Sequence, residues 1–307
     1  MENNPIDDLL EDRNKQIPVI GVPIVNGLHW LERLVGSIDY PVKNFVIINN
    51  SGDKLFTTNL EHKVKAWRET NVLVEEFHLI NFPSNMGVAF AWNCIIKSFL
   101  LEPYWIISNH DTAFTPGLLE EMYNEALNPS IGMIHPNRGN YTQGSFDLFL
   151  IKDEVVKVIG LFDENLYPAY GEDVDYIMRL FNANIIRKCG LSRVHLHGEH
   201  PSGDPANGSF VGHQREYREK VDIDEINKEN YDDLYKDSGG NTAKDIEDDL
   251  QIKLKEINEV NYTYLDKKWG IHWRGSWPHK HPMNNPTMPQ SYTTFDLDFV
   301  RNKHLGF

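Results

Sequence analysis

The chain has 307 residues, of which 40% are hydrophobic and 11% aromatic, so it can bury a substantial core in one large domain or two. Its formal net charge of −15 argues against a sequence-independent grip on nucleic acid or anionic lipid, and we expect no nucleic-acid partner. No apolar run is long enough to span a membrane, and residues 1–16 are polar, which predicts a flexible tail and no transmembrane segment. Two cysteines, Cys94 and Cys189, lie in apolar sequence and predict buried, reduced thiols in a cytoplasmic protein.

Apolar strands and amphipathic helices alternate over the first part of the chain. Each strand is followed by a polar turn, and helical spacing of apolar residues begins at Leu28 and again at Val88. This alternation predicts an α/β fold with a mainly parallel sheet flanked by helices, and with the polar ends of four strands at one edge. The expected strands are Ile17–Val25, Phe45–Ile48, a stretch near Phe77–Ile80, and Tyr104–Ser108.

A polar cluster leaves the fourth of these strands. It contains Asn109 and Asp111, at the carboxyl end where open α/β sheets bind their ligands. A lone aspartate there suits Mg²⁺ or Mn²⁺ when a substrate diphosphate supplies the other oxygens. Helix capping is the alternative, because Thr115 precedes a proline and a helical apolar stripe. Capping explains Thr115 but not Asp111.

The second half of the chain places two acids at the start of a helix. A strand at Phe146–Ile151 and a short helix capped by Asp153 come first. Glu172 and Asp173 then begin an amphipathic helix, where the helix dipole favours negative charge. A well-capped helix therefore accounts for the two acids without any catalytic role, and both interpretations stay open on the residues alone.

Two histidines stand in a short strand expected near Arg193–His200. His195 and His197 share one face because side chains alternate along a strand. Two imidazoles at this spacing suit a metal site, and a solvated strand end explains them equally well.

Five polar motifs occur in a fixed order between Ile17 and His200. The motifs are Pro23-Ile24-Val25-Asn26, Asn49-Asn50-Ser51, Asn85-Met86-Gly87 through Asn93, Asn109-His110-Asp111-Thr112, and Phe162-Asp163-Glu164 with Glu172-Asp173-Val174-Asp175. Their order and spacing resemble those of the family 2 glycosyltransferases of the GT-A fold, and the aspartate motif followed by threonine is similar to the rhamnosyltransferase-like branch.

The resemblance implies a GT-A (Rossmann-like) catalytic domain over residues 17–200 and a metal-dependent, inverting glycosyltransferase. Such an enzyme moves a sugar from a nucleotide-diphosphate sugar to a hydroxyl of a glycan or similar acceptor. Asp111 with His197 or His195 would hold Mn²⁺ or Mg²⁺ on the diphosphate. Asp173 would be the general base, kept ionised by the helix N-terminus, and Glu172 would orient the acceptor. The expected donor contacts are Pro23, Val25, Asn26, Asn50, Ser51, Asn85, Gly87, Asn93 and Asn109.

Residues 201–307 are expected to form a mostly helical extension that contributes to the acceptor side. One amphipathic helix is predicted through residues 246–257. Trp269, Trp273 and Arg274 follow in an aromatic stretch. Aromatic faces stack on sugar rings, so these residues form either an acceptor wall or an anchor for the tail.

Two other functions compete with glycosyl transfer. A sugar-1-phosphate nucleotidyltransferase also uses an α/β sheet and metal-bound aspartates, but nothing like its Gly-x-Gly-x-Arg loop follows the first strand. A non-catalytic GT-A-like binding module would keep the fold without turnover. Asp111, Asp173 and the histidines argue against that module, and donor hydrolysis with Mn²⁺ separates the two.

Overall fold

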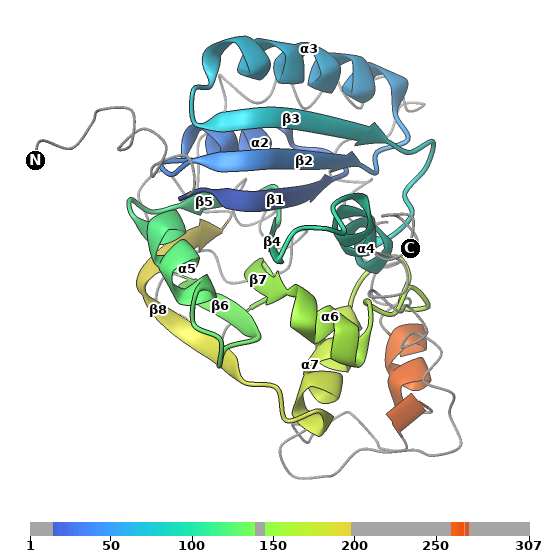
Figure 1. The fold of residues 1–307 in the computed structure, drawn as a ribbon. Helices are drawn as coiled ribbons and strands as arrows, with labels where there is room; N and C mark the ends of the chain where they lie inside the picture. The colour runs from blue at the N-terminus through green and yellow to red at the C-terminus, as the bar shows by residue number, and fades with distance from the viewer. Residues whose placement is uncertain (1–14, 139–144, 198–258, 267, 270–307) are drawn as a thin grey trace, which may run out of the picture.

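A mixed eight-stranded sheet forms the centre of the computed structural model, which describes residues 15–138, 145–197, 259–266, 268 and 269 (Figure 1). The strand order is β3-β2-β1-β4-β7-β6-β8-β5. The strands are β1 (Ile17–Ile24), β2 (Val42–Asn49), β3 (Val74–Asn81), β4 (Tyr104–Ser108), β5 (Thr112–Phe114), β6 (Met133–Arg138), β7 (Leu148–Lys152) and β8 (Arg187–His197). The helices are α2 (Leu28–Gly36), α3 (Lys54–Thr70), α4 (Val88–Ser98), α5 (Leu118–Ala126), α6 (Asp153–Ile159) and α7 (Glu172–Asn182).

The sheet changes character after β4. The first four strands are parallel to their neighbours, as their alternation with helices predicts. β7 then pairs antiparallel to β4, and β6 pairs antiparallel to β7. β8 runs parallel to β6, while the short β5 is antiparallel to β8. The polar ends of β1 to β4 therefore meet at one edge, where the antiparallel β7 begins.

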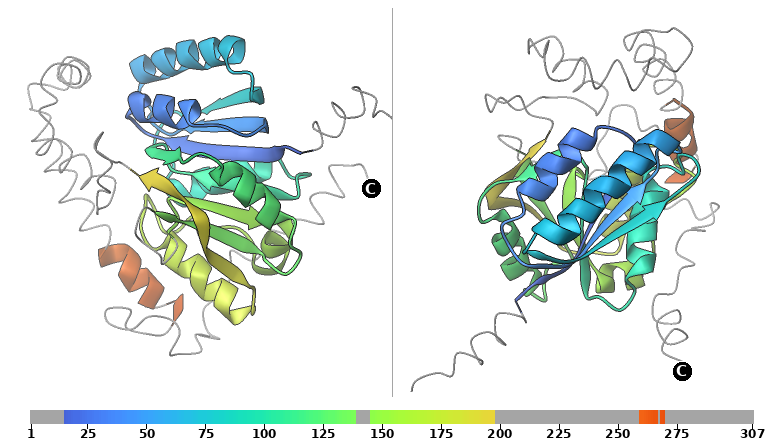
Figure 2. Two further views of the ribbon diagram at one scale, coloured as in Figure 1. Left: turned by 90° about the vertical axis from the view of Figure 1, so that its left-hand side faces the viewer. Right: turned by 90° about the horizontal axis from the view of Figure 1, so that it is seen from above.

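Helices cover both faces of the sheet (Figures 1 and 2). One core contains apolar residues of α2, α3 and α5, and the other contains those of α4, α6 and α7. In β4, Tyr104 and Ile106 belong to the first core, whereas Trp105 and Ile107 belong to the second. This burial on both faces is why β4 is apolar throughout. α4 approaches β1 so closely that a Cβ at Gly21 would overlap the side chain of Ile95.

Two helices begin differently from the sequence prediction. The N-cap of α5 is Gly117, and Thr115 instead donates its hydroxyl to the carbonyl of Val194 in β8. β5 pairs with β8 just before this point, so Thr115 is used to join the two segments. The N-cap of α6 is Lys152, which makes Asp153 its first helical residue.

The cysteines only partly match their prediction. Both are free thiols, with Cys94 half-buried in α4 and Cys189 exposed on β8 rather than buried. Within the described part of the chain, no helix has the length and apolar character needed to cross a bilayer.

A helical segment at residues 259–266, 268 and 269 lies beside α7, as both views show (Figures 1 and 2). We call it the C-terminal segment. Its Leu265 and Trp269 pack against Leu166 and against Met178 of α7. The helix predicted through residues 246–257 lies outside the described residues, as do residues 1–14 of the predicted tail.

Candidate active site

The turns that follow β2 and β3 are fastened to one another. Asn50 is buried and donates from Nδ2 to the Gly87 carbonyl at 3.1 Å, while its Oδ1 accepts from the Met86 amide at 3.5 Å. Asn85 is exposed, and its Oδ1 accepts from the Gly87 amide at 2.9 Å. Ser51 is half-buried beside Asn50. The carboxamide of Asn50 thus shapes this edge, and the exposed Asn85 is placed to meet a ligand.

The turns after β1 and β4 are also in contact. A Cβ at Gly27 would lie 3.2 Å from Nε2 of His110, so the two turns pack closely. Val25 is exposed and Pro23 half-buried. Among the described residues, Oδ1 of the half-buried Asn26 is shielded from solvent without a hydrogen-bond donor. This amide oxygen is available to an N–H of a bound base or sugar.

The loop that carries Asp111 is held in a tight turn. The carbonyl of the half-buried Asn109 accepts the hydroxyl of Thr112 at 3.0 Å, and its amide donates to the Asp147 carbonyl at 2.7 Å. Asp111 is buried at this turn. Thr112 is the register partner of His197 in β8, so the backbone of His197 lies alongside the residue that follows Asp111.

The assignment of Asn93 to donor binding is wrong in this structure. Asn93 is buried in α4, and its Nδ2 donates to the Phe162 carbonyl at 2.9 Å and to Oε1 of Glu164 at 2.8 Å. Its Oδ1 accepts from the Phe162 amide at 2.9 Å. Both side-chain N–H groups donate within the protein, so Asn93 holds the segment at Phe162–Glu164, which precedes α7.

The two acids of α7 stand in its first turn. The helix begins after Gly171, which has a φ of 100° and provides no side-chain cap, so stabilisation of the first turn by its own acids stays an alternative to a catalytic role. Asp173 is half-buried and its Oδ1 accepts from the amide of Val174 at 2.8 Å. Glu172 is buried, and no described residue hydrogen-bonds its Oε2.

Both of these carboxyl groups are harder to ionise than usual. Burial raises the pKa of Glu172 well above its ordinary value, and the neighbouring charge of Asp173 raises it further. Burial also raises the pKa of Asp173, helped by the charge of Asp147, although backbone N–H groups oppose the shift. Desolvation thus outweighs the effect of the helix N-terminus on the pKa of Asp173.

Asp147 is a site residue that the sequence analysis missed. It lies just before β7, and its backbone carbonyl receives the amide of Asn109. Its Oδ2 lies 3.8 Å from Nε2 of His195, and its charge acts on Asp173. The only signal was an acid at the start of a strand. Its place at the functional edge follows from the antiparallel direction of β7, which the sequence pattern did not reveal.

His195 on β8 is fully buried. It is the register partner of Phe114, two residue pairs further into the ladder than the backbone of His197. Nearby His135 is also buried, and desolvation lowers its pKa to about 3, so it is neutral at physiological pH.

A metal would find few ligands here. In the described segments, no three His, Cys, Asp or Glu side chains are grouped closely enough to hold an ion. Asp111 supplies a buried carboxylate at this edge, and Mg²⁺ and Mn²⁺ accept few protein ligands when phosphate oxygens complete the shell. The donor types therefore fit a metal carried with a diphosphate, but not a permanent all-protein site.

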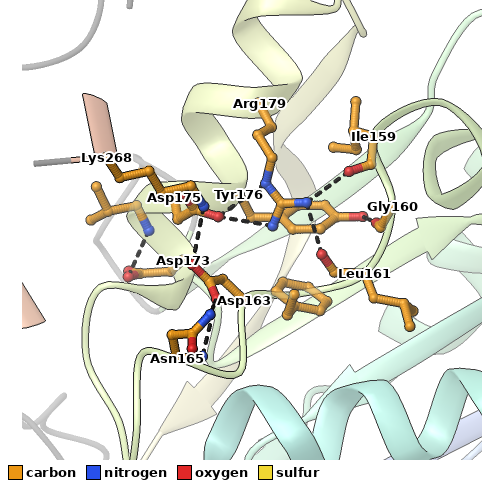
Figure 3. Close-up of polar contacts among 12 residues, drawn as sticks. Ile159, Gly160, Leu161, Asp163, Asn165, Asp173, Asp175, Tyr176, Arg179 and Lys268 are labelled. Carbon is orange, nitrogen blue, oxygen red and sulfur yellow. Dashed lines mark hydrogen bonds and ion pairs between the residues drawn. The ribbon is translucent and has the colours of Figure 1, made fainter. Parts of the chain in front are cut away.

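Two other acids of the Phe162–Asp175 stretch are fully paired (Figure 3). Asp163 accepts from Lys268 Nζ at 3.1 Å and from the hydroxyl of Tyr264 at 2.9 Å. Asp175 pairs with Lys268 and with Arg179.

The assignment of Trp269 to the acceptor side is wrong, and the anchoring alternative describes it. Trp269 is 3% exposed, and its Nε1 donates to Oδ1 of Asp175 at 2.9 Å. The indole therefore faces the core and α7. Trp273 and Arg274, the other two predicted acceptor residues, lie outside the described residues.

Comparison with known proteins identifies the fold. No protein-family model matches the chain. A galactofuranosyl glycosyltransferase from Leishmania donovani is 22% identical over 234 residues, which cover 55% of this chain and 54% of the relative. The chain thus spans about half the length of that curated relative.

The chain also resembles solved structures. GalNAc-T7 with UDP, GalNAc and Mn²⁺ superposes with a TM-score of 0.50 and 13% identity over 86% of this chain and 58% of that one. TarS from S. aureus in complex with UDP-GlcNAc gives a TM-score of 0.46 and 15% identity, and the match covers 69% of each chain. The similarity to GalNAc-T7 confirms the GT-A fold predicted from the sequence.

Proposed function

We propose that the chain is a metal-dependent, inverting glycosyltransferase that moves a sugar from a nucleotide-diphosphate sugar to a hydroxyl of a glycan or similar acceptor. The GT-A fold and the glycosyltransferase relative support the reaction class. The resemblance to family 2, and to its rhamnosyltransferase-like branch, supports the inverting course.

The observation that carries the proposal is the position of Asp147. Its backbone holds the Asn109 turn that leads to Asp111, and its carboxylate lies beside His195 of β8 and influences Asp173 of α7. Asp147 thus connects the turn of the proposed metal ligand with the proposed base, which are far apart in sequence, and this connection supports the proposal. Transfer requires this arrangement, because the leaving diphosphate and the attacking hydroxyl meet at a single anomeric carbon.

Asp173 is assigned as the general base. As the acceptor hydroxyl attacks the anomeric carbon, its proton passes to the Asp173 carboxylate and the carbon–oxygen bond to the diphosphate breaks on the opposite face. A raised pKa suits this role, because a base is most effective when its pKa approaches the working pH. Burial raises the pKa of Glu172 as well, and we assign its carboxyl group to orienting the acceptor.

Asp111 and His197 are assigned to the divalent cation, Mn²⁺ or Mg²⁺. When bound, the cation supplies Lewis-acid stabilisation to the leaving diphosphate. His197 is preferred over His195 because it pairs with Thr112, next to Asp111. Pro23, Val25, Asn26, Ser51, Asn85, Gly87 and Asn109 line the proposed donor edge, with Asn50 holding its shape.

The test is metal-dependent donor binding followed by turnover. A panel of nucleotide sugars with Mn²⁺ should contain a donor that stabilises the protein by about 2.7 kcal/mol at 100 times its dissociation constant. Asp111→Ala should lose the Mn²⁺-dependent part of this stabilisation while the protein without ligand melts as the wild type does. Unchanged Mn²⁺-dependent binding by the variant would remove Asp111 from the metal site.

Turnover separates the proposal from its alternatives. Release of the nucleotide diphosphate with Mn²⁺ present, in the absence or presence of acceptor, supports a transferase. Tight donor binding with no release would indicate a non-catalytic GT-A-like module. Pyrophosphate release from a nucleoside triphosphate and a sugar 1-phosphate would indicate the nucleotidyltransferase.

A further inference from the structure

A buried ion network joins the C-terminal segment to α7 (Figure 3). The side chain of Lys268 is 2% exposed and contacts two carboxylates, Asp163 and Asp175, that are fully buried. Arg179, also in α7, pairs with Asp175 as well, with its Nε at 3.0 Å and its Nη2 at 2.9 Å from Oδ2 of the carboxylate. Two cations therefore balance two carboxylates, which is the condition under which buried charges are tolerated.

Other contacts of the C-terminal segment converge on the loop that precedes α7. Nδ2 of Asn261 donates to the carbonyls of Ala169 and Tyr170, at 2.9 and 3.0 Å. A Cβ at Gly171 would lie 3.0 Å from Cδ1 of Leu265, so the segment lies directly against the residue where α7 begins. The segment thus holds the loop at residues 169–171 and, through Lys268, the acids on either side of it.

We propose that Lys268 is a positioning residue for glycosyl transfer, and that the C-terminal segment belongs to the catalytic unit. This inference rests on the proposed function, because it concerns the placement of Glu172 and Asp173. Lys268 ties Asp163, which lies before the loop, to Asp175, which lies two residues after Asp173. The first turn of α7 is thereby fixed at both its ends.

The turn needs such external support because its own cap is weak. Gly171 offers no side-chain oxygen to the first amides of α7, and Glu172 and Asp173 repel one another. An aspartate that must take a proton from an attacking hydroxyl is sensitive to its position, and a displacement of about 1 Å can reduce the rate about 100-fold. Lys268 does not touch the proposed reacting atoms, so its effect should appear in kcat rather than in donor binding.

The experiment uses the full-length chain and three variants. Lys268→Met removes the ammonium group but leaves two carboxylates against one arginine, so it should melt at a lower temperature than the wild type. The double variant Asp163→Asn/Lys268→Met removes one charge of each sign and should recover most of that loss. Lys43→Met is the matched control. Lys43 pairs with Glu102 at 2.7 Å in a half-exposed site near the start of β2, whereas the candidate site lies at the other end of that strand.

We expect kcat to fall about 10- to 100-fold in both Lys268→Met and the double variant, with the KM for the donor within about three-fold of the wild type. Lys43→Met should match the wild type in both constants. A double variant with near-normal kcat would show that Lys268 only balances charge, and the proposal would be overturned.

A second measurement keeps this inference distinct from the proposed function. Amide hydrogen exchange at residues 172–176 should be faster in the double variant than in Lys43→Met, whether or not a donor has been identified. If the wild type transfers no sugar yet exchange rises in this way, the proposed function fails while the positioning contact stands. Unchanged exchange at these residues would refute the positioning contact directly.

Discussion

Four of the acids between residues 163 and 175 form two pairs with opposite surroundings. Asp163 and Asp175 are fully buried and each contacts Lys268, with Arg179 adding to Asp175. Glu172 and Asp173 form no ion pair with any described lysine or arginine, and burial raises the pKa of both. The first pair holds the chain together, whereas the second remains available for chemistry.

The difference shows that partners, and not residue type, assign the role of an acid. Asp173 and Asp175 belong to the same helical turn, yet Asp175 enters the ion network whereas Asp173 accepts backbone amides such as that of Val174. Desolvation without a cationic partner makes a carboxylate a stronger proton acceptor, which is what a general base needs.

The largest effect expected is on turnover in Asp173→Asn. An amide cannot take the acceptor's proton, so kcat should fall about 10²- to 10⁴-fold. Donor affinity and melting temperature should stay near the wild-type values, because asparagine can accept the amide of Val174 much as aspartate does. Steady-state kinetics beside a thermal melt measure both. Activity within a few-fold of the wild type would move the base to another acid.

Asp175→Asn should do the reverse and damage stability first. Removing one partner of a buried ion network leaves uncompensated charge, so the free energy of unfolding should fall by about 3–5 kcal/mol. Asp153→Asn is the control, since Asp153 forms a partly exposed pair with Lys157 at 3.2 Å and should cost under about 1 kcal/mol. Urea denaturation compares them. Equal losses in the two variants would contradict the distinction between the pairs.

The pH dependence of turnover should report the raised pKa of Asp173. Only its ionised form accepts a proton, so kcat should decline as the pH falls through a pKa above the ordinary 3.8. Asp147→Asn removes a like charge, so this acid limb should move to lower pH. Asp147→Asn should reverse only part of the rise in the pKa of Asp173, because burial is the largest cause of that rise. If the acid limb of the kcat profile moves to higher pH in Asp147→Asn, the charge of Asp147 does not raise the pKa of Asp173.

Glu172→Gln should give the smallest effect, visible only as a function of pH. A carboxyl whose folded pKa is raised contributes full stability below its ordinary pKa of 4.5 and loses it as the pH rises through the folded value. Glutamine does not titrate, so the melting temperature of the variant relative to the wild type should increase with pH. A difference that is constant between acidic and alkaline buffers would show that Glu172 is not desolvated as described.

The sequence predicted the parallel half of the fold well and the antiparallel half poorly. β1 and β4 are continuous apolar runs because helices cover both faces, and that pattern is visible without a structure. β5 has only three residues and β6 includes His135, Pro136 and Asn137, so neither produces a strand signal. Which neighbour a strand pairs with depends on contacts distant in sequence, and β7 joining β4 reversed the expected direction.

For the candidate site, the sequence located most segments but not the partners of each side chain. Asn93 and Trp269 have the right chemistry for a sugar contact, yet the folded chain uses their polar atoms itself. Asp147 went unnoticed because a single acid before a strand is common. The mutual positions of Asp147, Asn109 and His195 depend on tertiary contacts, which no local pattern encodes.

The contact between Lys268 and Asp163 also affects the order in which the molecule is made. The two residues are 105 positions apart, so at about 5–20 residues per second Lys268 is synthesised about 5 to 20 s after Asp163. For much of that interval the chain through β8 has been synthesised, but Asp163 and Asp175 have no lysine to pair with. We therefore expect the central sheet to assemble early on the ribosome and the first turn of α7 to reach its final position only when the C-terminal segment emerges.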